Sequence, residues 1–512
     1  MMKTSFEARW AIYFEATIIL VFLGGFLFFV AKYVTLFPLV EYRQWIFGRG
    51  IKQIIQYLSL NGFFSIPASY EFFSISFSRS YSVVVALILS SVCGSNHFCH
   101  NGFQISMIIV AASFASFATW RLSFSRSLMP ALTTLVVVLF SVPILDAIAW
   151  QATLLDKTAM LMVAVTLWIV SSVNLALPPP AWRINAVLLL FFFLAYNAKE
   201  SSHFLAPTIL SLLYFRFRLT GVYIWLSIVK SLRLVIIPVI YSTIHVALVV
   251  YDRIFISINE FSRVTGGDVC QNLQKYIQYI FNFPNSTFSM VDLSPLMAVV
   301  VAFVVLPSII SSRKSPDKPP PLQIWALFAF LGSMIIPIRT SIAAPFYLLI
   351  PMLYFGMMLG LIVDYILVRV NGIRWRVAIR VLVVLVLFGR VISVFETETQ
   401  YKRLMNLSDN FWETLDKVRS EIAADMPVRI IFATSPGEAR TYMFVAAPGA
   451  TGKHALAPYL LPKGASIDMQ ERVDATISDV PVDKLDGIQD PQELVVTIDR
   501  NLELQAMYRG RR

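Results

Sequence analysis

Long apolar segments recur along most of this chain, and they constrain its fold more than any other feature. About 20 mostly apolar residues are enough to cross the roughly 30 Å hydrocarbon core of a membrane. The segments that meet or approach this length most clearly are 16–31, 131–145, 186–195, 234–250, 296–310, 347–368 and 381–394. Charged residues make up only 14% of the chain, whereas an average soluble domain has about 25%. The sequence therefore predicts an all-α polytopic membrane domain over residues 1–394.

Basic residues cluster in the short gaps between apolar segments, as they do in cytoplasmic loops of membrane proteins. These gaps are Arg121 with Arg126, Arg183, Arg216 with Arg218, 313–318 and 369–380. The apolar run 81–92 is too short to cross, and counting it as a span would place the Arg121 gap outside. We expect this run to lie on the outer leaflet, within a long first outer loop of about 32–102.

This assignment gives about eleven spans in the cytoplasmic (inner) membrane, with the amino terminus in the cytoplasm. No small-residue cleavage site follows the first apolar segment, so we expect an uncleaved first span. The segment 222–233 is either an interfacial helix or half of a tilted span. The basic gaps also account for the net charge of +11, so no nucleic-acid partner is predicted.

The composition turns ordinary after the last apolar segment. Residues 395–512 are numerous enough for a small domain. Within them, 428–434, 441–447 and 493–499 have the pattern of strands, and 410–424 that of an amphipathic helix. We expect a small α+β domain outside the cytoplasmic membrane. The three cysteines lack metal-site spacing, and Cys93 with Cys99 could form a disulfide in an oxidising compartment.

Charged residues at the predicted outer ends of spans are the candidates for chemistry, because charge near hydrocarbon is costly. Asp146 and Asp156 flank the second outer loop around Trp150, and Lys199 with Glu200 ends another span. The alternative is that they form an ordinary interfacial loop and a solvated span end. An Arg in the first outer loop, Arg79, suits a phosphate, although interfacial snorkelling is the alternative.

The order of these residues is typical of one class of enzyme. The first outer loop holds Glu41, then Arg79 ahead of the short apolar run, then a turn over 94–101 that contains His100. The second holds a Pro-x-x-Asp-x-x-x-Trp pattern and a further Asp at position 156, ten residues after the first. Arg339 precedes a helix with aromatic residues and proline. Together with Lys199 and Glu200, these motifs resemble GT-C glycosyltransferases, the class of protein O-mannosyltransferases and lipid A aminoarabinose transferases.

The resemblance covers about residues 1–394. It implies an inverting hexosyl- or pentosyltransferase that moves a sugar from a polyprenyl-phosphate donor to a cell-envelope glycan, lipid or protein acceptor. Catalytic carboxylates would be Glu41, Asp146 and Asp156. Residues that bind the donor phosphate would be Arg79, Lys199 and Arg339, and supporting residues would be Glu200, Trp150 and His100. Glu41 would act as general base, or as a ligand of a divalent cation, Mg or Mn.

The chain departs from the family pattern at three positions. Glu41 stands where the family has Asp, Leu154 where it has Arg, and Ser80 where it has Pro. These departures leave two alternatives open. One is a transporter or flippase of lipid-linked sugar, which would use a similar basic groove without a catalytic carboxylate. The other is a catalytically inactive envelope scaffold whose tail binds partners.

Overall fold

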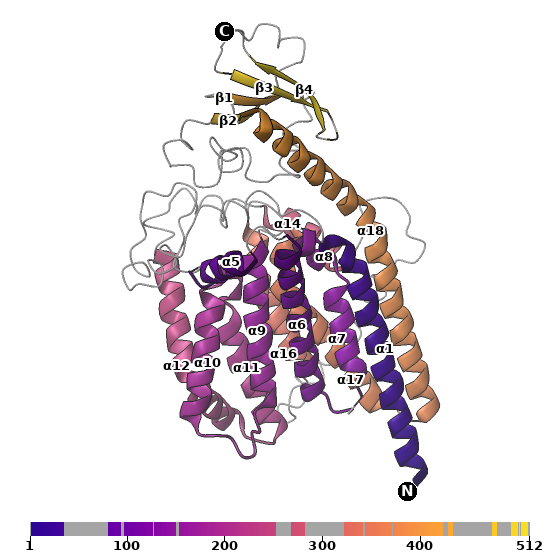
Figure 1. The fold of residues 1–512 in the computed structure, drawn as a ribbon. Coiled ribbons are helices and arrows are strands. Elements are labelled where there is room, and N and C mark those ends of the chain that lie inside the picture. The colour runs from indigo at the N-terminus through magenta and orange to yellow at the C-terminus, as the bar shows by residue number, and fades with distance from the viewer. Residues whose placement is uncertain are drawn as a thin grey trace.

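A bundle of helices is joined by one long helix to a small sheet (Figure 1). This computed structural model describes residues 2–34, 80–93, 97–125, 127–149, 153–251, 268–281, 322–340, 344–370, 372–422, 429–433, 474–478, 493–499, 501 and 503–509. The bundle helices are α1 (Met2–Val34), α5 (Ser80–Cys93), α6 (His97–Leu122), α7 (Met129–Leu139), α8 (Val142–Ala149), α9 (Leu154–Ser172), α10 (Ala181–Tyr196), α11 (Leu205–Leu219), α12 (Ile224–Tyr251), α14 (Val269–Phe281), α16 (Leu322–Ser333) and α17 (Leu349–Arg369). Short 3-10 helices are η3 (Glu200–Ser202), η5 (Pro337–Arg339) and η6 (Pro345–Leu348), and the long helix is α18 (Ile373–Ile422).

Seven helices within the described residues are long and apolar enough to cross a membrane. Their apolar segments are Tyr13–Ala31, Phe98–Leu122, Leu154–Ser172, Ile224–Val250, Leu322–Arg339, Pro345–Arg369 and Ile373–Phe395. The helices α7 and α8 form an eighth candidate that bends by 53°. The structure thus agrees with a mostly helical, polytopic membrane protein. The predicted number of eleven spans is not confirmed, and the predicted span 296–310 lies outside the described residues.

The central helix α17 packs closely on α7 through two glycines one turn apart. A Cβ atom at Gly360 would lie 2.5 Å from the carbonyl oxygen of Pro130, and one at Gly356 would lie 3.1 Å from that of Thr134. The Thr134 hydroxyl donates to the Gly356 carbonyl at 3.1 Å. This Gly-x-x-x-Gly spacing lets two membrane helices approach backbone to backbone. Nearly all of α17 is buried as a result.

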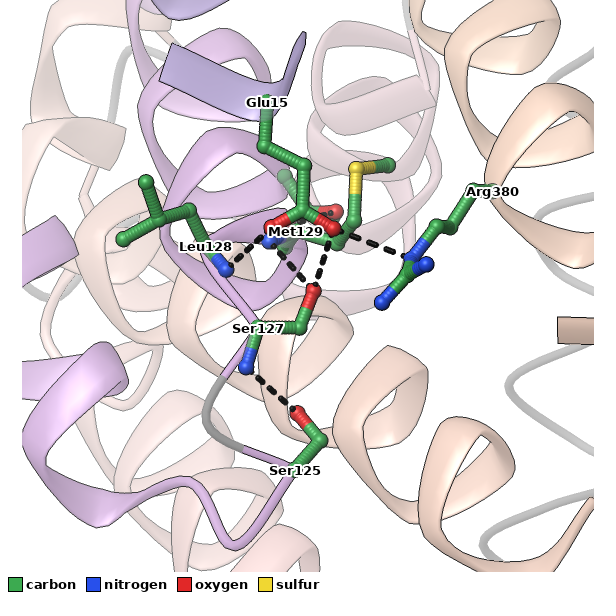
Figure 2. A network of polar contacts seen from close by, with 7 residues as sticks. Glu15, Ser125, Ser127, Leu128, Met129 and Arg380 are labelled. Carbon is green, nitrogen blue, oxygen red and sulfur yellow. Dashed lines mark hydrogen bonds and ion pairs between the residues drawn. The ribbon is translucent and has the colours of Figure 1, made fainter. Parts of the chain in front are cut away.

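A buried carboxylate joins α1 to the turn between α6 and α7 (Figure 2). Glu15 accepts hydrogen bonds from the Ser127 hydroxyl and the Leu128 amide, each at 2.7 Å. Its Oε1 also lies 3.0 Å from the Nε of Arg380 in α18. Leu128 is the N-cap of α7 and has no side-chain cap of its own. Glu15 therefore caps the Leu128 amide from another helix, while the Ser127 hydroxyl accepts from the Met129 amide at 3.1 Å, and this helix end favours negative charge.

The same turn is held from a second side by α17. The carboxylate of Asp364 accepts from the backbone N–H groups of Phe124 at 2.9 Å and Ser125 at 2.8 Å. Backbone donors that no helix satisfies are thus paired with buried carboxylates. Together with Glu15, Asp364 fixes the positions of three helices around one short turn.

The opposite end of the bundle, away from the start of α1, is covered by short helices. There α5 lies across the ends of the longer helices (Figure 1), and its predicted position on the outer leaflet stays a prediction. Its last residue, Cys93, forms a disulfide with Cys99 of α6, with Cα atoms 5.5 Å apart. Its first turn is tied to the end of α10, because the Tyr81 amide donates to the Asn197 carbonyl at 2.9 Å.

The long helix α18 leads out of the bundle and ends at the sheet (Figure 1). Its 50 residues correspond to about 75 Å at 1.5 Å per residue. The predicted domain boundary at residue 395 falls within this continuous helix. A buried stripe in its second half comprises Leu407, Phe411, Leu415, Val418 and Ile422, and Asn410 donates to the Asn501 carbonyl at 2.8 Å.

The sheet has the strand order β2-β1-β3-β4. Its strands are β1 (Arg429–Ala433), β2 (Asp474–Ser478), β3 (Glu493–Ile498) and β4 (Leu504–Arg509). The central strand β1 runs parallel to β2 and β3, and β4 is antiparallel to β3. The predictions for β1 and β3 are confirmed, β2 and β4 were not predicted, and the predicted strand 441–447 lies outside the described residues.

Candidate functional site

Charged residues from three elements gather at the end of the bundle where α5, α8 and α14 lie (Figure 1). Asp146 belongs to α8, Asp156 to the first turn of α9, and Lys199 to the segment directly after α10. Sequence reasoning had placed all three at outer ends of spans. The fold brings two of the predicted motifs together here.

Asp156 and Lys199 form an ion pair. The Oδ2 of Asp156 lies 3.4 Å from the Nζ of Lys199, and the two side chains are 4% and 14% exposed. The first turn of a helix favours a carboxylate, because the unpaired amides there carry partial positive charge. Asp156 is therefore stabilised as an anion, while Lys199 keeps limited access to water.

Asp146 is tied to the segment that precedes α17. Its Oδ2 accepts a hydrogen bond from the Phe346 amide at 3.1 Å. The next residue, Tyr347, has its ring centroid 5.7 Å from the Nζ of Lys199, a distance typical of a cation–π contact. The short helix η6 thus contacts both the predicted second-loop acid and the predicted phosphate-binding lysine.

Lys157 is a site residue that sequence reasoning missed. Its side chain is only 1% exposed, and both Asp156 and Asp146 act on it electrostatically. Its Nζ donates to the Oε1 of Gln104, which is itself buried in α6. The sequence signal was an adjacent Asp-Lys pair in a predicted outer loop, which ordinarily indicates solvated charges. The burial comes from the packing of α6 against α9.

His100, a predicted supporting residue, lies one helical turn before Gln104. It is buried on the same face of α6. A small apolar cluster of Leu89, Cys93, Met107 and Leu154 joins α5, α6 and the start of α9. The disulfide that ends α5 is part of this cluster, with Cys99 packed against it.

Arg339 reaches the same end of the bundle from η5, and its side chain is exposed. The backbone on both sides of it is held by α14. The Nδ2 of Asn272 donates to the carbonyls of Ile338 at 3.1 Å and Thr340 at 2.7 Å, and the Tyr276 hydroxyl donates to the Pro337 carbonyl at 3.2 Å. This role of α14 was not predicted.

Two tyrosines of α14, Tyr276 and Tyr279, have raised pKa values in this part of the structure. Burial raises the pKa of Tyr276 to about 12. Burial also raises the pKa of Tyr279, and the nearby carboxylate of Asp146 adds to the effect. Both hydroxyls therefore stay protonated at neutral pH and remain hydrogen-bond donors.

Glu200, another predicted supporting residue, begins η3 beside a cluster of aromatic and imidazole rings. It acts electrostatically on His245 of α12. The ring of His203 lies 5.4 Å from that of His245 and 5.2 Å from that of Tyr196. The rings of Tyr196 and His245, 5.4 Å apart, pack α10 against α12, and the scattered histidines gave no sequence signal for this contact.

The remaining predicted site residues, Glu41, Arg79 and Trp150, lie outside the described residues. No protein-family model, characterised protein or solved structure matches this chain. Among the described residues, no three His, Cys, Asp or Glu side chains are placed to hold a metal ion. The centre of the described site is formed by the carboxylates of Asp146 and Asp156 and the ammonium groups of Lys157 and Lys199, with the ring of Tyr347 beside Lys199.

Proposed function

We propose that this protein is a GT-C type glycosyltransferase that moves a sugar from a polyprenyl-phosphate donor to a cell-envelope glycan, lipid or protein. One observation carries the proposal: Asp146 and Asp156 act on the same lysine, and Asp156 pairs with Lys199 from a separate motif. In the sequence these motifs are weak one by one. Their meeting at one end of the bundle supports a shared site.

We further propose eleven spans with a cytoplasmic amino terminus. The seven apolar helices, the bent pair α7–α8 and the shorter apolar helix α10 are candidates for nine of them. We assign the tenth to α11, whose last turn carries Arg216 and Arg218 at the proposed cytoplasmic end. The last is the predicted span 296–310. The direction of the helices supports this topology, since the turns after α6, α9, α11 and α17 lie at the end where α1 begins (Figure 1). The disulfide, the candidate site and the sheet lie at the opposite end, which would face outward from the inner membrane.

The proposed reaction inverts the sugar at its anomeric carbon. The acceptor hydroxyl attacks this carbon while the bond to the phosphate oxygen breaks, so the electron pair leaves with polyprenyl phosphate. A carboxylate takes the hydroxyl proton. By resemblance this is Glu41, with Asp146 and Asp156 orienting the acceptor.

Lys199 suits the phosphate-binding role. Its ammonium group lies beside an aromatic ring and keeps 14% exposure. Fixed cations in a water-poor site stabilise the negative charge that develops on a leaving phosphate. Arg339, exposed on a backbone held by α14, supplies a second cation for the same end of the donor.

Binding of undecaprenyl phosphate tests the proposal. The full-length protein in nanodiscs is titrated with undecaprenyl phosphate and, separately, with undecaprenol. We expect the phosphate to bind and Lys199→Met to weaken binding about 10- to 100-fold, as for loss of one bond to a charged group. Lys275→Met, in an exposed position of α14, should change it less than about twofold. Equal binding of alcohol and phosphate, or no effect of Lys199→Met, would overturn the proposal.

A further inference from the structure

The buried residue Lys157 lies near two carboxylates, those of Asp146 and Asp156. In many proteins a pair of carboxylates binds a metal ion. Lys157 is almost fully buried and lies within electrostatic reach of both Asp146 and Asp156. An ammonium group removed from water is stable only when it is paired and hydrogen-bonded. Here it has two anionic neighbours and the carbonyl oxygen of Gln104. Burial disfavours the ammonium form of Lys157, and these three partners favour it.

The carboxylates already have partners that a metal ion would have to displace. Asp146 accepts from the Phe346 amide, and Asp156 pairs with Lys199. Mg²⁺ and Mn²⁺ favour octahedral sites of oxygen ligands. A divalent ion between these two acids would meet the positive charges of Lys157 and Lys199 at close range. The arrangement fits an ammonium ion and does not fit a metal.

Gln104 orients the lysine. It is buried in α6, and its Oε1 accepts from Lys157, so the amide cannot be flipped without losing this bond. Its Nε2 has no hydrogen-bond partner within the described part of the chain. The carbonyl of Gln104 thus satisfies Lys157, while its own unsatisfied amide group is a cost to stability.

We propose that Lys157, positioned by Gln104, is the built-in cation of the Asp146–Asp156 pair, and that no divalent ion binds between these two carboxylates. The inference concerns the site of the proposed glycosyltransferase. In that reaction the ammonium group of Lys157 keeps both carboxylates ionised and in place. It balances the charge of this pair, whereas the divalent cation that the resemblance implies would be held by Glu41.

Binding of Mn²⁺, followed by electron paramagnetic resonance, tests this on the full-length protein in nanodiscs. Up to about 1 mM, the weak end of protein cation sites, we expect wild-type protein to show no Mn²⁺ binding that Asp146→Asn or Asp156→Asn removes. Mn²⁺ that stays bound in both variants lies elsewhere and agrees with the proposal. Binding lost in either variant would overturn it.

Lys157→Met gives the complementary test, because it keeps an unbranched side chain that is only one atom shorter and removes the charge. We expect the folded variant to gain a Mn²⁺ site at least about 10-fold tighter than any wild-type binding at this position, and to lose it when Asp156→Asn is added. A folded Lys157→Met protein without such a site counts against the inference. If the variant does not fold, the wild-type measurement still decides. None of these results depends on donor lipid, so failure to bind undecaprenyl phosphate would remove the proposed function alone.

Discussion

The carboxylate of Asp156 and the ammonium group of Lys199 lie 3.4 Å apart, although they come from different helical hairpins. Asp156 follows the loop after α8, and Lys199 follows α10. Each residue alone fits an ordinary charged span end. The pairing makes them one unit, with Lys157 and Tyr347 as immediate neighbours.

Removing either member of this pair should slow transfer, and removing both should be no worse than removing one. We expect Asp156→Asn and Lys199→Met each to lower the rate about 100-fold or more, because Lys199 meets the leaving phosphate and Asp156 holds the ammonium group of Lys199 in place. Residues that act as a unit give non-additive effects. The measurement is the recovery, by mass spectrometry, of an envelope glycan that is missing from a deletion strain. Independent, multiplying losses would show that the ion pair is not a functional unit.

Sequence reasoning reached Asp146, Asp156 and Lys199 because their sidedness follows from the positive-inside pattern. It missed Lys157 because an Asp-Lys pair in a predicted loop looks solvated, and only the packing of α6 on α9 buries it. Neighbouring helical residues point about 100° apart, so one of the two charges could turn into the interface. Whether Asp156 or Lys157 turns into the interface depends on how α6 packs on α9, and the local sequence does not determine that packing.

The boundary placed at residue 395 shows a similar limit. The composition changes there from apolar to polar, which marks where the helix leaves its apolar surroundings. The residues that follow include many good helix formers, such as Glu, Gln, Lys, Arg, Leu and Met, and neither proline nor glycine occurs in 391–422. The change in composition near residue 395 therefore does not end the helix, and α18 continues without a break from residue 373 to residue 422.

The disulfide between Cys93 and Cys99 predicts a specific thiol count. Without reductant, the denatured protein should react with a maleimide reagent at one cysteine, the exposed Cys270. After reduction it should react at three. Replacing both Cys93 and Cys99 by Ser should cost about 2 kcal/mol, the loop-closure value for so short a loop. Three reactive thiols before reduction would contradict both the disulfide and an oxidising environment at the candidate site.

The contact between α17 and α7 predicts that Gly360→Ala is destabilising. The added Cβ would lie 2.5 Å from the Pro130 carbonyl oxygen, so the backbones must separate at a cost of about 1–3 kcal/mol. Gly25→Ala in α1 is the matched control, because no atom lies within 4 Å of its Cβ position. Alanine there should stabilise the helix by about 0.5–1 kcal/mol. The melting temperatures of the Gly360→Ala and Gly25→Ala variants are measured in detergent at one scan rate. Equal melting temperatures of the two variants would contradict the close packing of α17 on α7.

Glu15→Gln should destabilise the bundle far from the candidate site. The amide keeps one acceptor oxygen, but Ser127 and Leu128 each donate to a different oxygen of Glu15, so one buried donor loses its partner. Arg380 loses its counter-ion as well, although its side chain is 23% exposed and can reach water. We expect a loss of about 2–4 kcal/mol, measured as a lower melting temperature. Glu413→Gln, at an exposed position of α18, should be nearly neutral.

Arg380→Met should cost less than Glu15→Gln, because Glu15 would keep its two hydrogen bonds, and the double variant should cost less than the sum of the two. Glu15→Gln protein as stable as Glu413→Gln protein would mean that the α7 terminus does not need its cap from α1.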